Sequence, residues 1–448
     1  MPFRQGKITV KLFKRIAVSL LTGLLLKAGL GCAQNVANET FKKGIEYAVQ
    51  GRFEDAKEKF KEALKTDPTL GSAKDSLKVI EDLTDKKTES EAAIYFFKGL
   101  DYTLKWQWDK AIGEYDKATE LNPSFAEAYN YRGVVYLENN QNDKAISDFN
   151  KAIELNPRYG RAYTNRGAAY SKKGKYDQAI SDSEKAIEID PMDAPAYNNR
   201  GLANVARGQH DRGLSDLNKA IEINPRVDKF YFSRGLAHSE KGQYERAVSD
   251  YTKAIKLNPS NFYAYTNRGN VYLRKGQYDL AIVDFNKAIE INSGNTTAYL
   301  NRGYAYAQGK GQYDYAASDY SKAIEIDPKD AESYTKRGKL YLQQAQYDQA
   351  IADFTKAIEI NPKDADAYTD RGAAYAQGKG QYDQAIVDFT KAIEIKPGDD
   401  TAYTNRGLAY YYKGEHDKAW EDVHRVQSLG YQVHPGFLKA LSEASGRQ

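Results

Sequence analysis

Ten glycines recur at a nearly constant interval along most of this chain, and that interval constrains the fold more than any other feature. Successive glycines lie 34 residues apart, except at two steps of 35; they are Gly99, Gly133, Gly167, Gly201, Gly235, Gly269, Gly303, Gly338, Gly372 and Gly407. A fixed period of this length is typical of solenoids, in which each repeat buries its apolar face against its neighbours. It therefore overrides the division into two or three compact domains that 448 residues would otherwise suggest.

Each repeat has the pattern of two helices, as residues 126–157 illustrate. Both halves carry an apolar stripe with helical spacing, separated by a polar break; the stripes are Tyr129, Gly133 and Tyr136, and then Ala145, Phe149 and Ala152. Small residues allow two helices to approach closely, and the larger aromatic rings fill the space on either side. A proline follows the second stripe and ends the unit, because proline cannot continue a helix.

This order of aromatic, Gly, Tyr, Ala, Phe, Ala and Pro over 34 residues resembles the tetratricopeptide repeat, and the resemblance covers about residues 92–430. It implies an all-α fold, a right-handed superhelical solenoid of antiparallel helix pairs. It also implies a concave groove lined mainly by the first helix of each pair.

The periodicity also predicts how the chain is divided. Residues 34–68 form one further unit of this type, which 21 extra residues separate from the main array. We expect an isolated hairpin at 34–68, a linker helix with a hinge at 69–91 and an array of ten units at 92–430. Residues 431–448 are expected to form a C-terminal capping helix, which solenoids need to cover their last apolar face.

Residues 1–33 have the features of a signal peptide. Six basic residues and no acidic one accompany an apolar run at 16–26, which is too short to span a bilayer. Cleavage after Ala33 would release a soluble exported protein, whereas cleavage before Cys32 would leave a lipid-anchored one, as in bacterial lipoproteins. A retained N-terminus is the third alternative. The leader favours a protein exported to the periplasm or cell envelope.

The basic net charge belongs to this leader. The whole chain carries +4, so residues 34–448 carry about −2. Nucleic-acid binding is therefore not expected. Membrane contact is expected only through a lipid anchor at Cys32.

Arginines and aspartates recur in matching numbers. An arginine precedes the glycine in nine repeats, and an aspartate lies on the second helix of nine; the arginines are Arg132, Arg166, Arg200, Arg234, Arg268, Arg302, Arg337, Arg371 and Arg406. The arginines could line a groove for an acidic ligand. Their match with the aspartates instead favours salt bridges within the scaffold.

An asparagine occurs two residues before the glycine in five repeats: Asn165, Asn199, Asn267, Asn301 and Asn405. In long tetratricopeptide superhelices an inner ladder of asparagines binds an extended peptide. A carboxamide suits this role because it can donate to a carbonyl and accept from an N–H. The alternative is that asparagine is simply common at this offset.

Three aromatic residues depart from the repeat pattern in mid-array and are predicted to be exposed anchors for a partner: Phe232, Tyr263 and Tyr304. Ordinary surface aromatics are the alternative.

Catalytic motifs are not found. The five histidines lack metal-ligand spacing, and no nucleophile motif occurs. We therefore expect no enzyme, no cofactor and no metal. The predicted function is a protein-interaction scaffold that binds a partner protein or peptide in the groove. The alternative is a structural, self-associating component of a cell-envelope assembly.

Overall fold

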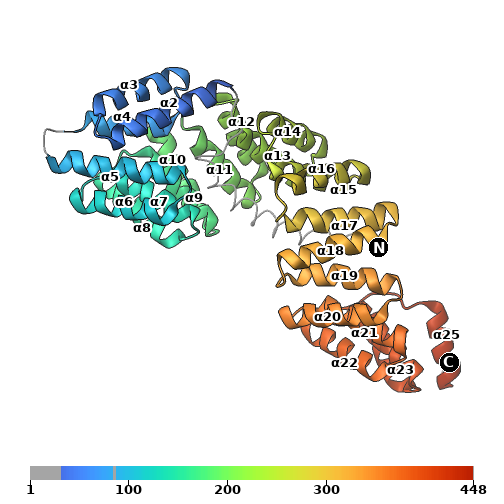
Figure 1. Ribbon diagram of the computed structural model, residues 1–448. Coiled ribbons are helices and arrows are strands. Elements are labelled where there is room, and N and C mark those ends of the chain that lie inside the picture. Colours follow the sequence, from blue (N-terminus) through green and yellow to red (C-terminus); the bar gives the residue numbers. More distant parts are fainter. Residues whose placement is uncertain (1–31, 84–86, 447–448) are drawn as a thin grey trace. The chain divides into compact units, whose positions relative to one another are not determined.

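The computed structural model describes residues 32–83 and 87–446, which form 24 helices and no strand (Figure 1). The predicted all-α fold of consecutive helix pairs is confirmed. Two compact units divide the chain, residues 1–271 and 272–448. Within the described residues no helix is both long and apolar enough to cross a membrane.

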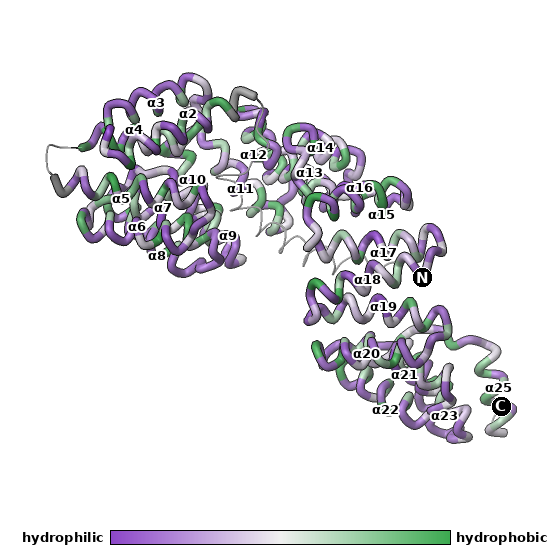
Figure 2. The backbone as a smooth tube through the Cα atoms, in the orientation of Figure 1, coloured by the Kyte–Doolittle hydropathy of each residue, from purple (hydrophilic) through white to green (hydrophobic). Residues whose placement is uncertain are grey.

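The helices of the first unit, with α15 running across its boundary, are α2 (Cys32–Val49), α3 (Phe53–Thr66), α4 (Gly71–Glu81), α5 (Lys87–Leu104), α6 (Trp108–Leu121), α7 (Ala126–Glu138), α8 (Asn142–Leu155), α9 (Gly160–Lys172), α10 (Tyr176–Ile189), α11 (Ala194–Ala206), α12 (His210–Ile223), α13 (Asp228–Glu240), α14 (Tyr244–Leu257) and α15 (Phe262–Arg274). Apolar residues recur at intervals along these helices between hydrophilic ones (Figure 2).

The helices of the second unit are α16 (Tyr278–Ile291), α17 (Thr296–Lys310), α18 (Tyr313–Ile326), α19 (Ala331–Gln343), α20 (Tyr347–Ile360), α21 (Ala365–Lys379), α22 (Tyr382–Ile395), α23 (Asp400–Tyr412), α24 (His416–Ser428) and α25 (Pro435–Ser445). The last of them packs Phe437 and Leu441 against Val423 of α24. An apolar face at the end of the array is thereby covered.

The expected leader, residues 1–33, lies outside the described residues apart from the start of α2. Cleavage after Ala33 and lipid attachment at Cys32 both stay predictions.

The repeated glycines mark the close approach of the two helices in a pair. A Cβ atom on Gly133 of α7 would lie 2.7 Å from Cε1 of Phe149 on α8. Gly235 lies in the same relation to Tyr251. Contacts this short do not occur between real atoms, so the helices can pack at this distance only without a side chain at the glycine.

The 35-residue units differ in their first helix, which has 15 residues instead of 13. In the extended end of α17, Gly309 lies against the ring of Tyr278, and a Cβ there would collide with the ring. The helix then ends at Gly311, whose φ of 60° lies in the left-handed region. Gly378 and Gly380 of α21 repeat both features.

The arginine and aspartate of a repeat are paired, as predicted. Arg166 donates from Nε and Nη2 to the two oxygens of Asp182, at 2.8 and 2.7 Å. Its Nη1 reaches Asn150 of the preceding repeat at 2.7 Å, and its guanidinium lies over the ring of Tyr163. The same pairing joins Arg132–Asp148, Arg200–Asp216, Arg234–Asp250, Arg302–Asp319, Arg337–Asp353, Arg371–Asp388 and Arg406–Asp422. These arginines therefore join helices within and between repeats.

The hairpin of α2 and α3 is not isolated, in contrast to the sequence-based expectation. Phe41 of α2 and Phe60 of α3 share one buried core with Phe96 of α5, and α4 adds Ala73 and Ile80 to it. The physical reason is the apolar face of α4, whose Ala73, Val79 and Ile80 are buried in the same core as residues of α5 and α7. The segment expected to be a linker with a hinge is thus part of the first unit's core.

Candidate functional site

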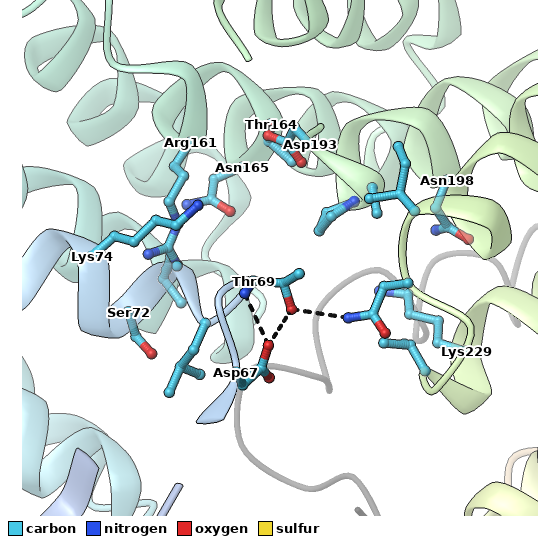
Figure 3. A pocket seen from close by; sticks show the side chains of 18 of the residues that line it. Asp67, Thr69, Ser72, Lys74, Arg161, Thr164, Asn165, Asp193, Asn198 and Lys229 are labelled. Atoms are coloured by element: carbon cyan, nitrogen blue, oxygen red, sulfur yellow. Dashed lines mark hydrogen bonds between the residues drawn. The ribbon is translucent and has the colours of Figure 1, made fainter. Parts of the chain in front are cut away.

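A cavity of about 700 Å³ lies in the first unit, on the inner face of its repeats. The first helices of four successive repeats, α7, α9, α11 and α13, supply one wall. Residues 38–42 of α2, the connection between α3 and α4 (67–70) and the start of α4 (71–74) supply the other (Figure 3). First helices therefore line a cavity here, and the N-terminal segments form its other side.

A buried ionic contact holds α4 on this inner face. Oδ2 of Asp75 accepts hydrogen bonds from Tyr131 of α7 at 3.2 Å, from Tyr159 at 2.9 Å and from Nη1 of Arg161 in α9 at 2.6 Å. Burial raises the pKa of both tyrosines well above its usual value, so their hydroxyls stay protonated as donors. Three donors from the repeats thus converge on one oxygen of α4.

The connection between α3 and α4 is tied to a repeat much later in the chain. Nδ2 of Asn224, at the end of α12, donates to Oγ1 of Thr69 at 3.0 Å. The amide and hydroxyl of Thr69 in turn donate to Asp67 (Figure 3). This chain of hydrogen bonds closes one side of the cavity.

Asn198 of α11 is the polar side chain of the cavity wall that lacks partners. It is 1% exposed, and within the described residues neither its Nδ2 nor its Oδ1 has a hydrogen-bond partner. Its neighbour in the wall, Thr164, is satisfied, since its hydroxyl donates to Asp193 at 2.7 Å. Asn198 therefore has a free donor and a free acceptor to offer a ligand. Each buried polar atom left unsatisfied lowers the stability of the fold by about 1–3 kcal/mol, so a ligand that pairs with Asn198 would relieve this penalty.

A lysine and a glutamate face the same cavity. Burial lowers the pKa of Lys229 in α13 to about 8, with Glu138 and Asp228 opposing the shift. Burial also raises the pKa of Glu138 in α7 to about 7, against the opposing charges of Lys172 and Lys229. Lys172 donates to the carbonyl of Leu137 at 2.8 Å. No carboxylate in the described part of the chain forms an ion pair with Lys229.

Two of the predicted asparagines, Asn165 and Asn199, line the cavity. Both use their amide donors inside the protein. Nδ2 of Asn165 donates to Oδ1 of Asn130 at 2.9 Å, and Nδ2 of Asn199 donates to the carbonyl of Thr164 at 3.2 Å. The structure thus places them together on the inner face, with part of their hydrogen-bonding capacity already engaged.

The other predicted residues do not line this cavity. Nδ2 of Asn267 donates to the carbonyl of Tyr263 one turn earlier in α15, at 2.8 Å, and the ring of Tyr263 stacks beside Phe262. In the second unit, Asn301, Tyr304 and Asn405 are half-buried on α17 and α23.

The prediction of Phe232 as an exposed anchor is wrong. Its side chain is fully buried, in a core with Leu202 and Leu217, and its ring centre lies 5.5 Å from that of Tyr251. The first helices of neighbouring repeats pack closely here. The large side chain of Phe232 therefore fills the space between α11, α12 and α14 rather than facing solvent.

The two residues that sequence reasoning missed, Asn198 and Lys229, were visible as departures from the repeat. Asn198 occupies an offset that is Thr in five sister repeats. Lys229 occupies the offset of Tyr263. Neither residue type by itself indicates a cavity, because the cavity forms only where the segment from α3 to α4 lies opposite the first helices.

The described residues contain no group of three or more His, Cys, Asp or Glu side chains placed to hold a metal ion.

Family profiles identify the repeats. Profiles described as "TPR repeat" match residues 99–140, 235–276, 310–344, 338–378 and 379–414. Profiles of the tetratricopeptide repeat match residues 126–159, 160–193, 194–227 and 262–295. No curated protein sequence matches the chain.

Several solved structures are similar. YrrB, described as a TPR protein with an unusual peptide-binding site, is 30% identical over 42% of this chain and 95% of its own, with a TM-score of 0.36. A tetratricopeptide repeat protein from Parabacteroides merdae is 22% identical over 56% and 98%, with a TM-score of 0.43. Yeast Tom70 is 14% identical over 92% and 95%, with a TM-score of 0.43.

Proposed function

Because the chain belongs to the tetratricopeptide repeat family, we propose that it is a non-enzymatic protein-interaction scaffold that binds a partner segment on the inner face of its first helices. The cavity between α7, α9, α11 and α13 is the observation that carries this proposal. Its volume falls in the range of ligand sites. The adjoining inner face already holds one helix of this chain, α4, through Asp75.

The asparagine ladder is part of this proposal. Asn165 and Asn199 lie on the wall of the cavity, and each carboxamide oxygen can accept from a peptide N–H. Asn267 and Tyr263 of the first unit would add to the contact there, and Asn301, Asn405 and Tyr304 would offer the same chemistry within the second unit. Five hydrogen bonds of about 1 kcal/mol each hardly exceed the cost of association, so additional contacts are needed for tight binding.

Export is the proposed context. The basic and apolar leader supports secretion to the periplasm or cell envelope, and Cys32 supports a lipid anchor. Metabolic labelling with palmitate, in the chain and in Cys32→Ala, tests the anchor. Labelling of the parent alone would support lipidation, and absence of label in both would favour cleavage after Ala33.

Affinity capture from envelope extract tests the interaction. Ala168→Trp would fill the cavity from its wall, and Ser181→Trp would place the same ring on the exposed surface of α10. Circular dichroism and melting first establish that both variants keep the parent's helicity. A partner recovered by the parent and by Ser181→Trp, and lost by Ala168→Trp, supports binding on the inner face.

The competing function is a self-associating structural array. Its support is four exposed apolar side chains on second helices of the second unit: Leu280, Val283, Tyr315 and Val387. Recovery of nothing but further copies of the chain in the capture experiment would favour this function. If the parent, Ala168→Trp and Ser181→Trp all recover the same different protein equally, that protein binds outside the cavity.

A further inference from the structure

The turn between α5 and α6 carries a tryptophan where the backbone favours glycine. Trp106 has a φ of 61°, in the left-handed region. Its amide donates to the carbonyl of Thr103, and the amide of Gln107 donates to that of Tyr102, as at helix ends built around a left-handed residue. A bulky side chain is strained in this conformation, so the local backbone does not account for Trp106. Eight of the eleven helix pairs place a glycine at this point of the turn: Gly51, Gly174, Gly208, Gly242, Gly276, Gly311, Gly380 and Gly414.

The ring of Trp106 is also presented to solvent. Trp106 is 39% exposed, and its ring centre lies 5.1 Å from that of Trp108, edge to face. Trp108 in turn packs against the buried core of the first unit. The exposed ring is thus held in position from inside the protein. Backbone strain of this kind is typical of functional positions, and an exposed indole ring is suited to binding.

The start of α2 lies at the same end of the first unit as this turn. A Cβ on Gly51, just after α2, would lie 3.8 Å from Cδ1 of Ile94, near the start of α5. Leu104, at the end of α5, lines the cavity together with Asn38 and Phe41 of α2. The two helices contact each other and are therefore antiparallel. Their register brings the first turns of α2 level with the α5–α6 turn, because both helices rise by the same amount per residue.

This end of the unit carries a second exposed apolar side chain and receives the leader. Val36 is 52% exposed, one turn after α2 begins at Cys32. The leader, with its apolar run at 16–26, joins the chain there. A leader that is retained, or one that is cleaved before an acylated Cys32, would hold this end of the unit at a membrane.

The surroundings of Trp106 suit a lipid surface better than a protein. Nζ of Lys105 pairs with Asp101 at 2.6 Å, and Asp109 and Lys110 follow at exposed positions of α6, so the nearby charges balance. An aromatic side chain covers about 150–250 Å², well below the roughly 800 Å² that each partner buries in a stable protein interface. Tryptophan is enriched at membrane interfaces, where its ring lies at the level of the lipid headgroups.

We propose that Trp106 and Val36 form a membrane-docking tip, in which both side chains enter the interfacial layer of a lipid bilayer. This contact goes beyond the proposed function, since it holds the first unit against a membrane without using the inner face of the array. It adds to the leader and does not require acylation of Cys32. Because the flanking charges balance, zwitterionic lipid is sufficient and salt has little effect.

The test uses the full chain and vesicles of phosphatidylcholine, with tryptophan fluorescence as a local probe. The chain has three tryptophans, so two variants that each keep one of them isolate the signal. The first carries Trp108→Phe and Trp420→Phe and keeps Trp106. The second carries Trp106→Gly and Trp108→Phe and keeps Trp420, which lies in the second unit. All forms retain residues 1–33, so the leader contributes equally.

Vesicle partitioning of single substitutions gives a second measurement. Trp106→Gly restores the residue of the sister turns, so it should melt at or above the temperature of the parent, and a loss of binding cannot then be attributed to misfolding. Val36→Ser removes the smaller side chain of the tip. Tyr315→Ser is the control, because it removes an exposed ring from the second unit.

The expected result is a blue-shifted emission of Trp106 on vesicle binding and its quenching by phosphatidylcholine brominated in the acyl chains. The variant that keeps Trp420 should show neither change. Trp106→Gly should weaken partitioning about tenfold, as expected when one large apolar side chain is no longer withdrawn from water. Val36→Ser should weaken it less, and Tyr315→Ser should partition like the parent.

Three results would overturn the proposal. One is unchanged partitioning of Trp106→Gly, and another is equal quenching of the two single-tryptophan variants. The third is a protein, captured by the parent, that Trp106→Gly loses while its vesicle binding is unchanged, since the tip would then bind a protein. None of these results depends on Ala168→Trp, so the docking tip and the proposed function are tested separately.

Discussion

Arg161 and Asp75, 86 residues apart in the sequence, form an ion pair of 2.6 Å in the interior of the first unit. The carboxylate also accepts from Tyr131 and Tyr159, so three side chains of the repeats donate to it. The acceptors of α4 and the donors of the repeats are thus complementary, although α4 lies outside the periodic array.

Asp75→Asn should strongly destabilise the first unit. The substitution leaves the half-buried Arg161 guanidinium without its counter-charge; for a fully buried pair this costs about 3–5 kcal/mol, which is an upper bound here. Urea unfolding, monitored by circular dichroism, should show an earlier transition. Asp82→Asn is the matched control, because that carboxylate is exposed and lies 3.8 Å from Lys78. Equal midpoints for the two variants would contradict the role assigned to Asp75.

Glycine to alanine changes should have opposite effects at two positions. In Gly133→Ala the new methyl group would meet the ring of Phe149, and overpacking of this kind costs about 1–3 kcal/mol. Gly113, inside α6, has no atom within 4 Å of the place its Cβ would occupy. Gly113→Ala should therefore stabilise by about 0.5–1 kcal/mol through helix propensity. Thermal unfolding of both variants measures the difference. Melting temperatures that shift in the same direction for Gly133→Ala and Gly113→Ala would contradict the prediction.

Arg371→Lys should destabilise the second unit by about 1–2 kcal/mol, because lysine cannot make the paired hydrogen bonds to Asp388 while also reaching Thr355. Lys391→Met is the control, since it removes an exposed pair with Glu394 and should leave the urea midpoint unchanged. An unchanged urea midpoint for Arg371→Lys would mean that the positive charge alone, without the planar guanidinium, is sufficient to stabilise the contact with Asp388.

Glu138→Gln should remove a pH dependence of stability. Burial raises the folded-state pKa of Glu138 to about 7 from about 4.5. Between these values the folded carboxyl keeps a proton that the unfolded one has lost, so stability falls as pH rises through this range. At pH 8 the variant should be more stable than the parent by on the order of 1–3 kcal/mol.

Urea midpoints at pH 5 and pH 8 check this prediction, with Glu120→Gln as the control at an exposed position of α6. A gain for Glu138→Gln that is the same at both pH values would show that packing, and not titration, is responsible.

The repeat itself was predictable because each of its constraints is local or recurs at one period. Gly133 must face Phe149, and the recurrence of both at the same spacing shows that two helices meet there. The pairing of Arg166 with Asp182 followed from matched numbers of opposite charges at fixed offsets.

The candidate site was only partly predictable. Asn165 and Asn199 line the cavity, but their internal hydrogen bonds depend on neighbouring repeats, and their role in binding stays a prediction. The misassignment of Phe232 arose because periodicity identifies the face of a helix but not how closely the next helix covers it. The contact between Asn224 and Thr69 joins residues 155 positions apart, and no local pattern encodes it.

The separation of Asp75 from Arg161 has a consequence for synthesis on the ribosome. Translation at about 5–20 residues per second leaves α4 without its ionic partner for about 4–17 s after Asp75 is added. During that interval its apolar residues are available to chaperones, and to the translocation machinery if the leader directs export. The N-terminal helices can complete their fold only after the third repeat of the array has been made, so the start of this protein matures later than its position in the chain would suggest.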